Sequence, residues 1–219
     1  MPENHDFSIV VLISGRGSNL QAIIDAVQGG EIPGRISAVI SNRAEAYGLE
    51  RAHAAGIPTE VLDHKRFPNR ESFDTALMAR IDDYAPDLVV LAGFMRILSD
   101  GFVEHYAGCM INIHPSLLPR YRGLNTHQRA IEAGDDWHGC SVHFVTPELD
   151  GGPVLLQGRV PIEAGDDAER LADRVHVMEH RIYPMAVAWI AQGRARLVEH
   201  RIQLDGKPLA EPVIQTLDD

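Results

Sequence analysis

An asparagine and a histidine stand two residues apart, at Asn112 and His114, at the end of an apolar run. Side chains at positions i and i+2 of a strand leave the same face, so these two groups would lie together. An amide donor beside an imidazole suits a reaction that develops negative charge on a carbonyl oxygen, and the imidazole can also move a proton near neutral pH. Local hydrogen bonding at a strand end is an equally good interpretation of this pair.

A carboxylate and a second histidine follow further along the chain. Asp150 precedes two glycines in a turn-forming segment, where its side chain can face a ligand or only complete the turn. If Asp150 lies near His114, its charge favours the imidazolium form. His143 is a further candidate for proton transfer, although a single histidine within an apolar strand is more often a core residue.

A glycine loop after the first apolar run, Gly15 to Asn19, is typical of a phosphate site. Backbone N–H groups and the positive end of the following helix would face the anion, although a tight turn that binds nothing has the same pattern. A dinucleotide site has less support, because Leu20 replaces the third glycine of that motif. The second strand ends at Arg43 without an acid for a ribose hydroxyl, which leaves only NADP open.

The remaining reactive side chains do not form a metal or nucleophile motif. His176 and His180 would share one helix face, but their spacing is not that of a zinc protease and no third ligand is evident. Cys109 and Cys140 lack the C-x-x-C spacing, and no serine stands in a G-x-S-x-G turn. We therefore expect no metal.

Strands and helices alternate through the first half of the chain and must position these groups. This order predicts an α/β fold, a Rossmann-like, mostly parallel twisted sheet with helices on both faces. Ligands of such sheets bind beyond the carboxyl ends of the strands. Ser18 and Gln21 form a capping-box pattern at the first helix. The predicted strands are 9–13, 36–41, 59–62, 87–92 and 110–113, and the predicted helices are 18–28, 44–55, 70–84 and 99–105.

The second half is less regular. A structured loop is expected at 115–125, with helices at 126–133 and 167–192, strands at 141–145 and 154–160, and a hairpin around Asp205-Gly206. We predict one catalytic domain over residues 1–194 and a small C-terminal tail, 195–219, that packs on the same domain.

Composition limits the classes of function. The 219 residues carry a formal net charge of -11, which argues against broad capture of nucleic acid. The amino terminus lacks the pattern of a signal peptide, and the apolar runs are far shorter than a membrane span. We expect a cytoplasmic enzyme of small molecules without a membrane or nucleic-acid partner, and either a monomer or a homodimer.

Five segments, in this order, resemble the phosphoribosylglycinamide formyltransferases, which are folate-dependent enzymes of purine synthesis. The block Asn-x-His-Pro-Ser-Leu-Leu-Pro, together with the distant Asp-Gly-Gly, is highly specific, whereas the glycine loop alone is not. The segments are 12–20, 39–43, 91–98, 112–119 and 139–153.

The resemblance implies transfer of the formyl group of 10-formyltetrahydrofolate, as co-substrate, to the amine of N1-(5-phospho-D-ribosyl)glycinamide. It implies that Asn112 is the oxyanion donor, His114 the acid–base residue and Asp150 the carboxylate that favours imidazolium. The implied binding residues are Gly17, Ser18 and Asn19 for the phosphate, Glu179 for the ribose, and Arg70, Met95, Arg96, Ile97, Leu98, Thr146, Pro147, Glu148 and Leu149 for the folate.

Two positions depart from this pattern. Pro147 stands where related chains usually carry an acid, which could stiffen the folate loop, and Arg122 is similar to the pattern of methionyl-tRNA formyltransferases. That rival normally has a further C-terminal domain, and a formyltetrahydrofolate hydrolase normally has a domain ahead of the catalytic one; we expect neither here. A folate or nucleotide sensor without turnover is the alternative from another class.

Overall fold

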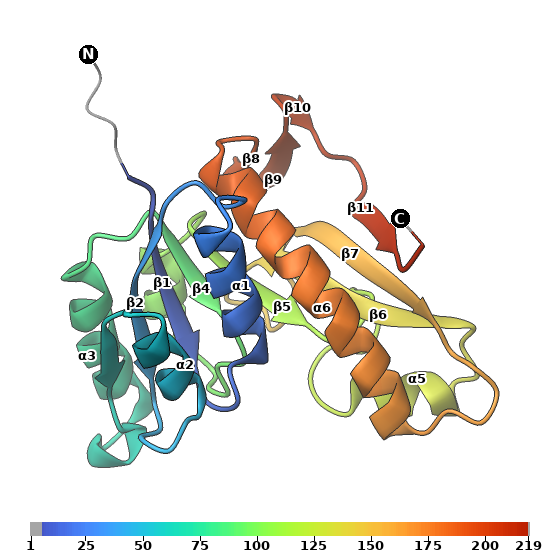
Figure 1. The fold of residues 1–219 in the computed structure, drawn as a ribbon, viewed down its shortest axis with the longest axis horizontal. Coiled ribbons are helices and arrows are strands. Elements are labelled where there is room, and N and C mark those ends of the chain that lie inside the picture. The colour runs from blue at the N-terminus through green and yellow to red at the C-terminus, as the bar shows by residue number, and fades with distance from the viewer. Residues whose placement is uncertain (1–5, 219) are drawn as a thin grey trace. The chain divides into compact units, whose positions relative to one another are not determined.

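The computed structural model describes residues 6–218 and divides into two compact units, Met1–Ile111 and Asn112–Asp219. Figure 1 labels their elements. Those of the first unit are β1 (Ser8–Ile13), α1 (Ser18–Gln28), β2 (Arg35–Ser41), α2 (Gly48–Ala54), β3 (Thr59–Val61), the 3-10 helix η1 (His64–Arg66), α3 (Arg70–Asp82), β4 (Leu88–Leu91) and α4 (Asp100–His105). Strand β5 (Met110–His114) leads into the second unit.

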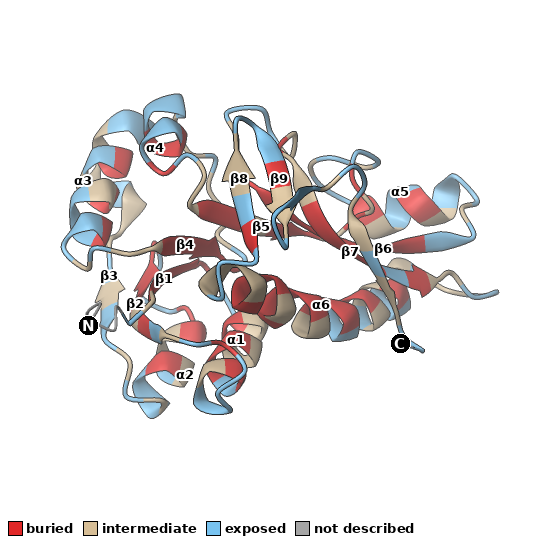
Figure 2. Cartoon of the chain, turned by 90° about the horizontal axis from the view of Figure 1, so that it is seen from above, coloured by how far each residue is buried: buried red, intermediate tan, exposed pale blue. Residues whose placement is uncertain are grey.

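The first unit has the strand order β4-β1-β2-β3, and its paired strands are parallel. The run Ile9 to Ile13 forms β1, which pairs with β2 on one side and β4 on the other. Each of these five residues is 0% exposed, and Figure 2 shows the buried strands in red. An apolar run without alternation therefore forms a strand covered on both faces, as the sequence predicts.

The starts of the first two helices differ from expectation. The capping box predicted at Ser18 and Gln21 is wrong, because the N-cap of α1 is Gly17 and, among the described residues, no side chain caps that helix. The side chain of Gln21 bonds Asp25 instead. Helix α2 begins at Gly48 rather than at residue 44, because the Gly48 amide donates to the Gly15 carbonyl at 3.0 Å and is held at the glycine loop.

The second unit has the strand order β11-β7-β6-β5 and a separate sheet β10-β9-β8. Strands β6 and β7 are antiparallel, whereas β7 and β11 are parallel. Helix α6 lies along β6 and β7 (Figure 1). The elements are α5 (Thr126–Glu132), β6 (Trp137–Phe144), β7 (Val154–Pro161), α6 (Ala168–Ala191), β8 (Ala195–Val198), β9 (Arg201–Leu204), β10 (Lys207–Pro208) and β11 (Val213–Thr216).

The prediction of an α/β fold with a mostly parallel sheet is confirmed by these pairings and by the solved structures described below. In the tail, β9 and β10 are antiparallel and joined at Asp205-Gly206, both with positive φ. The division into a catalytic domain over 1–194 and a tail over 195–219 stays a prediction.

Strand β6 begins at Trp137, four residues before the predicted start at residue 141. The added residues include Gly139, which pairs with Arg159 in the β6–β7 ladder. A Cβ at position 139 would lie 1.8 Å from the Gly158 carbonyl oxygen. Glycine is therefore used here to let two backbones approach closely, and not to end the strand.

We expect Gly139→Ala to lower the free energy of unfolding by about 3 kcal/mol or more, because the methyl group meets backbone that cannot rotate away. Thermal and urea unfolding followed by circular dichroism measures the loss. Gly101→Ala is the matched control, since no atom lies within 4 Å of a Cβ at that helical position. Equal stability of the two variants would contradict the expected clash.

Candidate functional site

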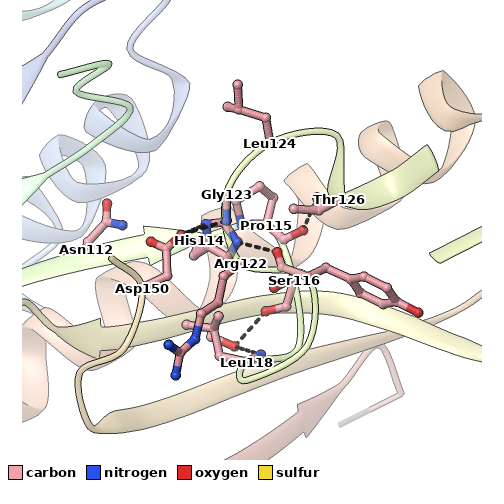
Figure 3. A network of polar contacts seen from close by, with 12 residues as sticks. Asn112, His114, Pro115, Ser116, Leu118, Arg122, Gly123, Leu124, Thr126 and Asp150 are labelled. Carbon is pink, nitrogen blue, oxygen red and sulfur yellow. Dashed lines mark hydrogen bonds and ion pairs between the residues drawn. The ribbon is translucent and has the colours of Figure 1, made fainter. Parts of the chain in front are cut away.

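His114 ends strand β5 and is 6% exposed. Its Nε2–H group donates to the Tyr121 carbonyl at 2.9 Å, because a carbonyl oxygen can only accept. Its Nδ1 atom lies 3.5 Å from the Asp150 Oδ2 atom (Figure 3). Both ring nitrogens thus face oxygen atoms, one from the loop 115–125 and one from Asp150.

Asp150 lies in a turn and has a left-handed φ of 48°. Its side chain is 9% exposed, and Oδ2 accepts the Gly123 amide hydrogen at 3.0 Å. Figure 3 shows this carboxylate beside His114 and Gly123. The structure thus brings together His114 and Asp150, which are far apart in the sequence, and holds the carboxylate against the loop 115–125.

Asn112 lies beside His143, the histidine that the sequence leaves open between proton transfer and a core position. The Asn112 Nδ2 atom is 3.3 Å from His143 Nε2, and His143 Nδ1–H donates to the Phe144 carbonyl at 3.0 Å. His143 Nε2 is therefore the acceptor, and burial lowers the pKa of this histidine. Asn112 donates one amide hydrogen to His143, which fixes the amide orientation and directs its second hydrogen elsewhere.

His143 also lies 3.9 Å from Asp150, between its Nε2 and Oδ1 atoms. It therefore contacts two of the three residues in the predicted catalytic set. Its position in an apolar strand hides this role from sequence reasoning. In the sequence, this role is indicated only by the position of His143 near the end of the strand that leads into the segment carrying Asp150.

A buried polar network holds the first part of the loop 115–125. The Ser141 hydroxyl donates to the Ser116 carbonyl at 2.7 Å and accepts from the Leu118 amide at 3.0 Å. Gln157 donates to the Leu118 carbonyl at 2.8 Å and to the Ser141 hydroxyl at 3.0 Å. Paired buried polar groups give a unique geometry, so this network sets where the chain leaves β5 after His114.

His127 on α5 and His138 on β6 share a hydrogen bond at 3.1 Å. Burial, and secondarily the charges of His176 and His114, lowers the pKa of His127 to about 4. Burial, and secondarily the neighbouring His127, lowers the pKa of His138 to about 4. Both histidines are thus held neutral in the folded protein near pH 7.

This pair should make stability depend on acid. Unfolded histidine titrates near 6.5, so between about pH 6.5 and 4 the unfolded chain binds more protons than the folded one. The two neutral histidines therefore contribute their full stabilisation of the folded state above about pH 6.5. We expect the free energy of unfolding to fall by about 2–4 kcal/mol as the pH is lowered from there to about 4. Urea unfolding at a series of pH values measures this slope, and a His127→Gln/His138→Gln variant should show a flatter one. An unchanged slope would contradict the assignment.

The predicted phosphate loop lies in the first unit, at the start of α1. Gly17 has φ 69°, and a Cβ there would lie 2.6 Å from the Gly48 Cα atom. Arg51 donates to the Arg16 carbonyl at 2.9 Å. The first intrahelical bond joins the Gln21 amide to the Gly17 carbonyl at 2.9 Å, so the amides of Ser18 and Asn19 belong to the helix terminus. Helix α2 therefore holds a loop suited to an anion.

The predicted folate segment of the first unit exposes apolar side chains. Met95 and Ile97 are 66% and 65% exposed, whereas Leu98 and Arg96 are half-buried. The Met95 amide donates to Ser14 Oγ at 2.8 Å, which joins this segment to the end of β1. Exposed apolar groups on a fixed backbone are typical of a ligand surface.

Asp74 anchors the end of this segment, whereas Arg70 lies at the surface of the same helix. The Ser99 amide donates to Asp74 at 2.6 Å, and Asp74 is 1% exposed on α3. Arg70, the first residue of α3, is exposed and pairs with Glu71 at 3.5 Å. The sequence pattern gave no reason to select Asp74, because one acid on an amphipathic helix normally faces solvent.

The predicted folate loop of the second unit covers Thr146, Pro147, Glu148 and Leu149. Leu149 is 56% exposed, and the Thr146 hydroxyl lies 3.4 Å from the Glu148 carbonyl. Glu148 forms an ion pair with Arg122. The folate loop is thus joined to the loop 115–125 by the Glu148 side chain, and the following Asp150 adds a second connection.

Glu179 lies on α6 and is 5% exposed. Burial, and secondarily the charge of Glu179, raises the pKa of Cys140 and of Tyr183. A buried carboxylate of this kind requires polar partners. The structure gives Glu179 a place beside the sheet of the second unit, and its predicted contact with a ribose stays a prediction.

Residues 6–218 lack the features of a metal site and of a membrane-spanning helix. In that range no group of three or more His, Cys, Asp or Glu side chains is arranged to hold a metal ion. The same residues contain no helix whose length and apolar character would let it cross a membrane.

The chain is similar to known proteins over most of its length. A family described as formyl transferase matches residues 7–187. Phosphoribosylglycinamide formyltransferase of Escherichia coli K12 is 58% identical over 92% of this chain and 95% of its own length, and the Haemophilus influenzae protein of that name is 52% identical over the same shares. A solved phosphoribosylglycinamide formyltransferase of Coxiella burnetii, in complex with CHES, is 55% identical, with a TM-score of 0.91 over 96% of this chain and 99% of that one.

Proposed function

This chain belongs to the formyl transferase family, and we propose that it transfers the formyl group of 10-formyltetrahydrofolate to the amine of N1-(5-phospho-D-ribosyl)glycinamide. The products are the N-formyl amide and tetrahydrofolate, in the synthesis of purine nucleotides. The support is the 58% identity to the Escherichia coli enzyme over nearly the whole of both chains, together with the arrangement of Asn112, His114 and Asp150.

The transfer begins when the acceptor amine attacks the formyl carbon. The carbonyl oxygen then gains negative charge, and we propose that the second Asn112 amide hydrogen and a protonated His114 stabilise it. The attacking amine loses a proton and the leaving folate nitrogen gains one, so no net proton is consumed. Asp150 favours the imidazolium of His114 by its charge and receives support from the Gly123 amide.

The binding roles follow the same assignment. We propose that Gly17, Ser18 and Asn19 bind the phosphate at the start of α1, and that Glu179 binds the ribose. We propose that folate binding involves residues that are exposed or half-buried: Arg70, Met95, Arg96, Ile97, Leu98, Thr146, Pro147, Glu148 and Leu149. Pro147 fixes one backbone angle of the folate loop, which lowers the entropy lost when that loop orders.

The chemistry uses the folate as a co-substrate and requires neither a metal nor a covalent intermediate with the protein. The location in the cytoplasm, the absence of nucleic-acid partners and the choice between monomer and homodimer stay predictions.

The test mixes the purified chain with 10-formyl-5,8-dideazafolate, a stable folate stand-in, and phosphoribosylglycinamide. Release of the deformylated folate is followed by absorbance. We expect turnover that requires the amine and yields the N-formyl product by mass spectrometry. Turnover at the same rate without the amine would identify a hydrolase, and tight folate binding without turnover would identify a sensor; either result would overturn the proposal.

A further inference from the structure

Arg122 and Glu148 join the two loops that meet at His114. We propose that this ion pair, the Arg122–Glu148 tie, is a positioning device: it holds the loop 146–152 against the loop 115–125 and so keeps the Asp150 carboxylate beside His114. The inference deepens the proposed function, on which its kinetic consequence rests. Neither residue is assigned to the reacting atoms by this inference, and Glu148 acts here through its neighbour Asp150.

The loop 115–125 is fixed on the side opposite to the tie. Arg129 of α5 donates to the Arg122 carbonyl at 2.7 Å and to the Leu124 carbonyl at 3.3 Å. Its guanidinium also lies over the Tyr121 ring, 5.2 Å from the ring centroid. The backbone of Arg122 is therefore anchored to α5, while its side chain extends to Glu148. Figure 3 shows Arg122 projecting from this loop on the side of Asp150.

The loop 146–152 transmits the position of Glu148 to Asp150. The Gly151 amide donates to the Glu148 carbonyl at 3.0 Å, which closes a tight turn with Asp150 inside it. Asp150 then accepts the Gly123 amide hydrogen at 3.0 Å and lies 3.5 Å from His114. The two loops are thus joined twice, once by the hydrogen bond from Gly123 to Asp150 and once by the tie between the preceding residue, Arg122, and Glu148.

The size of the effect follows from solvent exposure. The side chains of Arg122 and Glu148 are 38% and 66% exposed, so the pair is worth little to global stability and is screened by salt. Its role must therefore be local: without the tie, the Asp150 carboxylate keeps the Gly123 hydrogen bond and its contacts with His114 and His143, but the turn that carries it loses a second attachment to the loop 115–125. An exposed pair of this kind can also open to admit a ligand at small cost.

The first arm of the test needs no catalysis. Hydrogen exchange with peptide-level mass spectrometry compares the wild-type chain with Arg122→Gln, Glu148→Gln and the matched control Arg196→Gln, whose side chain contacts Gln203 on the β8–β9 sheet. We expect both tie variants to exchange up to about fivefold faster in 121–125 and also in 146–152. The control should match the wild type. About 1 M salt, where the Debye length is about 3 Å, should loosen the wild-type segments and leave Arg122→Gln unchanged.

The second arm measures formyl transfer. We expect each single variant to lower kcat by up to about fivefold, with the KM for the phosphorylated amine nearly unchanged. The double Gln variant should be no slower than either single one, because both remove the same contact. Arg122→Lys and the charge-reversed pair Arg122→Glu/Glu148→Arg should recover most of the rate.

Each arm can overturn the inference. Faster exchange in 121–125 alone, additive losses in the double variant, or no recovery in the charge-reversed pair would show that the two loops are not coupled through these side chains. If the charge-reversed pair does not fold, the exchange rates of the single variants and the effect of salt on the wild-type chain still show whether the two loops are coupled. A wild-type chain without turnover would remove the proposed function, and the exchange arm would still decide whether the tie exists.

Discussion

Asp150→Asn should lower kcat for formyl transfer about 10²- to 10⁴-fold, the usual contribution of positioned proton transfer. Asparagine has the size of aspartate and can still accept the Gly123 amide hydrogen, so the turn of residues 148–151 should persist. It lacks the charge that faces His114 at 3.5 Å and His143 at 3.9 Å. The loss should therefore appear in kcat, measured with both substrates at saturation, rather than in folate affinity.

Asp166→Asn is the matched control for this substitution. Its carboxylate is 5% exposed and pairs with Arg174, whose hydrogen bond lowers the pKa of Asp166. The control loses a buried, ion-paired carboxylate of the same unit, so it should be destabilised but should transfer formyl groups at nearly the wild-type kcat. If both variants lose activity equally, the effect of Asp150→Asn reflects folding and not the chemistry at His114.

Asn112→Ala should lower kcat about 10²- to 10³-fold, because one preoriented donor to a developing oxyanion contributes that much in other acyl transfers. The contact with His143 makes the donor preoriented, since it fixes which amide atom faces the substrate side. Because Asn112 meets the formyl oxygen mainly when charge develops, the KM for the folate should change much less than kcat. Steady-state kinetics with each substrate varied in turn measures kcat and the KM for the folate separately.

Gln203→Ala is a suitable control, because it removes an amide from a strand of the tail sheet whose partner is Arg196. It should leave both kinetic constants unchanged. A loss in Asn112→Ala that appears only in KM would indicate that Asn112 binds the folate in its ground state. That outcome would assign oxyanion stabilisation to His114 alone.

Much of the scaffold could be predicted because the apolar runs are long and uninterrupted. Ile9 to Ile13 form a fully buried strand, and the following glycine and helix come where the alternation requires them. The pairing of His114 with Asp150 was raised only as a condition, since two residues so far apart meet through loop packing and not through a local period. Their roles in catalysis stay predictions.

The errors have physical causes. Strand β6 starts before the predicted residue 141 and runs through Gly139, because a strand needs glycine where a neighbouring carbonyl oxygen would occupy the Cβ position. The Ser18 capping pattern failed because Gly17 already has the left-handed conformation that begins the helix. The Ser141 and Gln157 network escaped notice because isolated polar residues in strands give no signal until their partners across the sheet are known.

The contact between Gly17 and Gly48 constrains how this protein can change over evolutionary time. A methyl group on Gly17 would meet the Gly48 backbone at 2.6 Å, and one on Gly48 would meet Ile13 at 2.5 Å and Gly17 at 3.2 Å. The Ile13 contact is with the Cδ1 atom at the end of a side chain, which can shift, whereas the Gly48 Cα atom that faces Gly17 is backbone and cannot. In a mutant library selected for growth without added purines, Gly17 should therefore be the less tolerant of replacement, and Gly48 should also resist it, although only Gly17 lies in the loop assigned to the phosphate. Sequence invariance at Gly48 would then report the packing of a ligand loop, and not contact with the ligand itself.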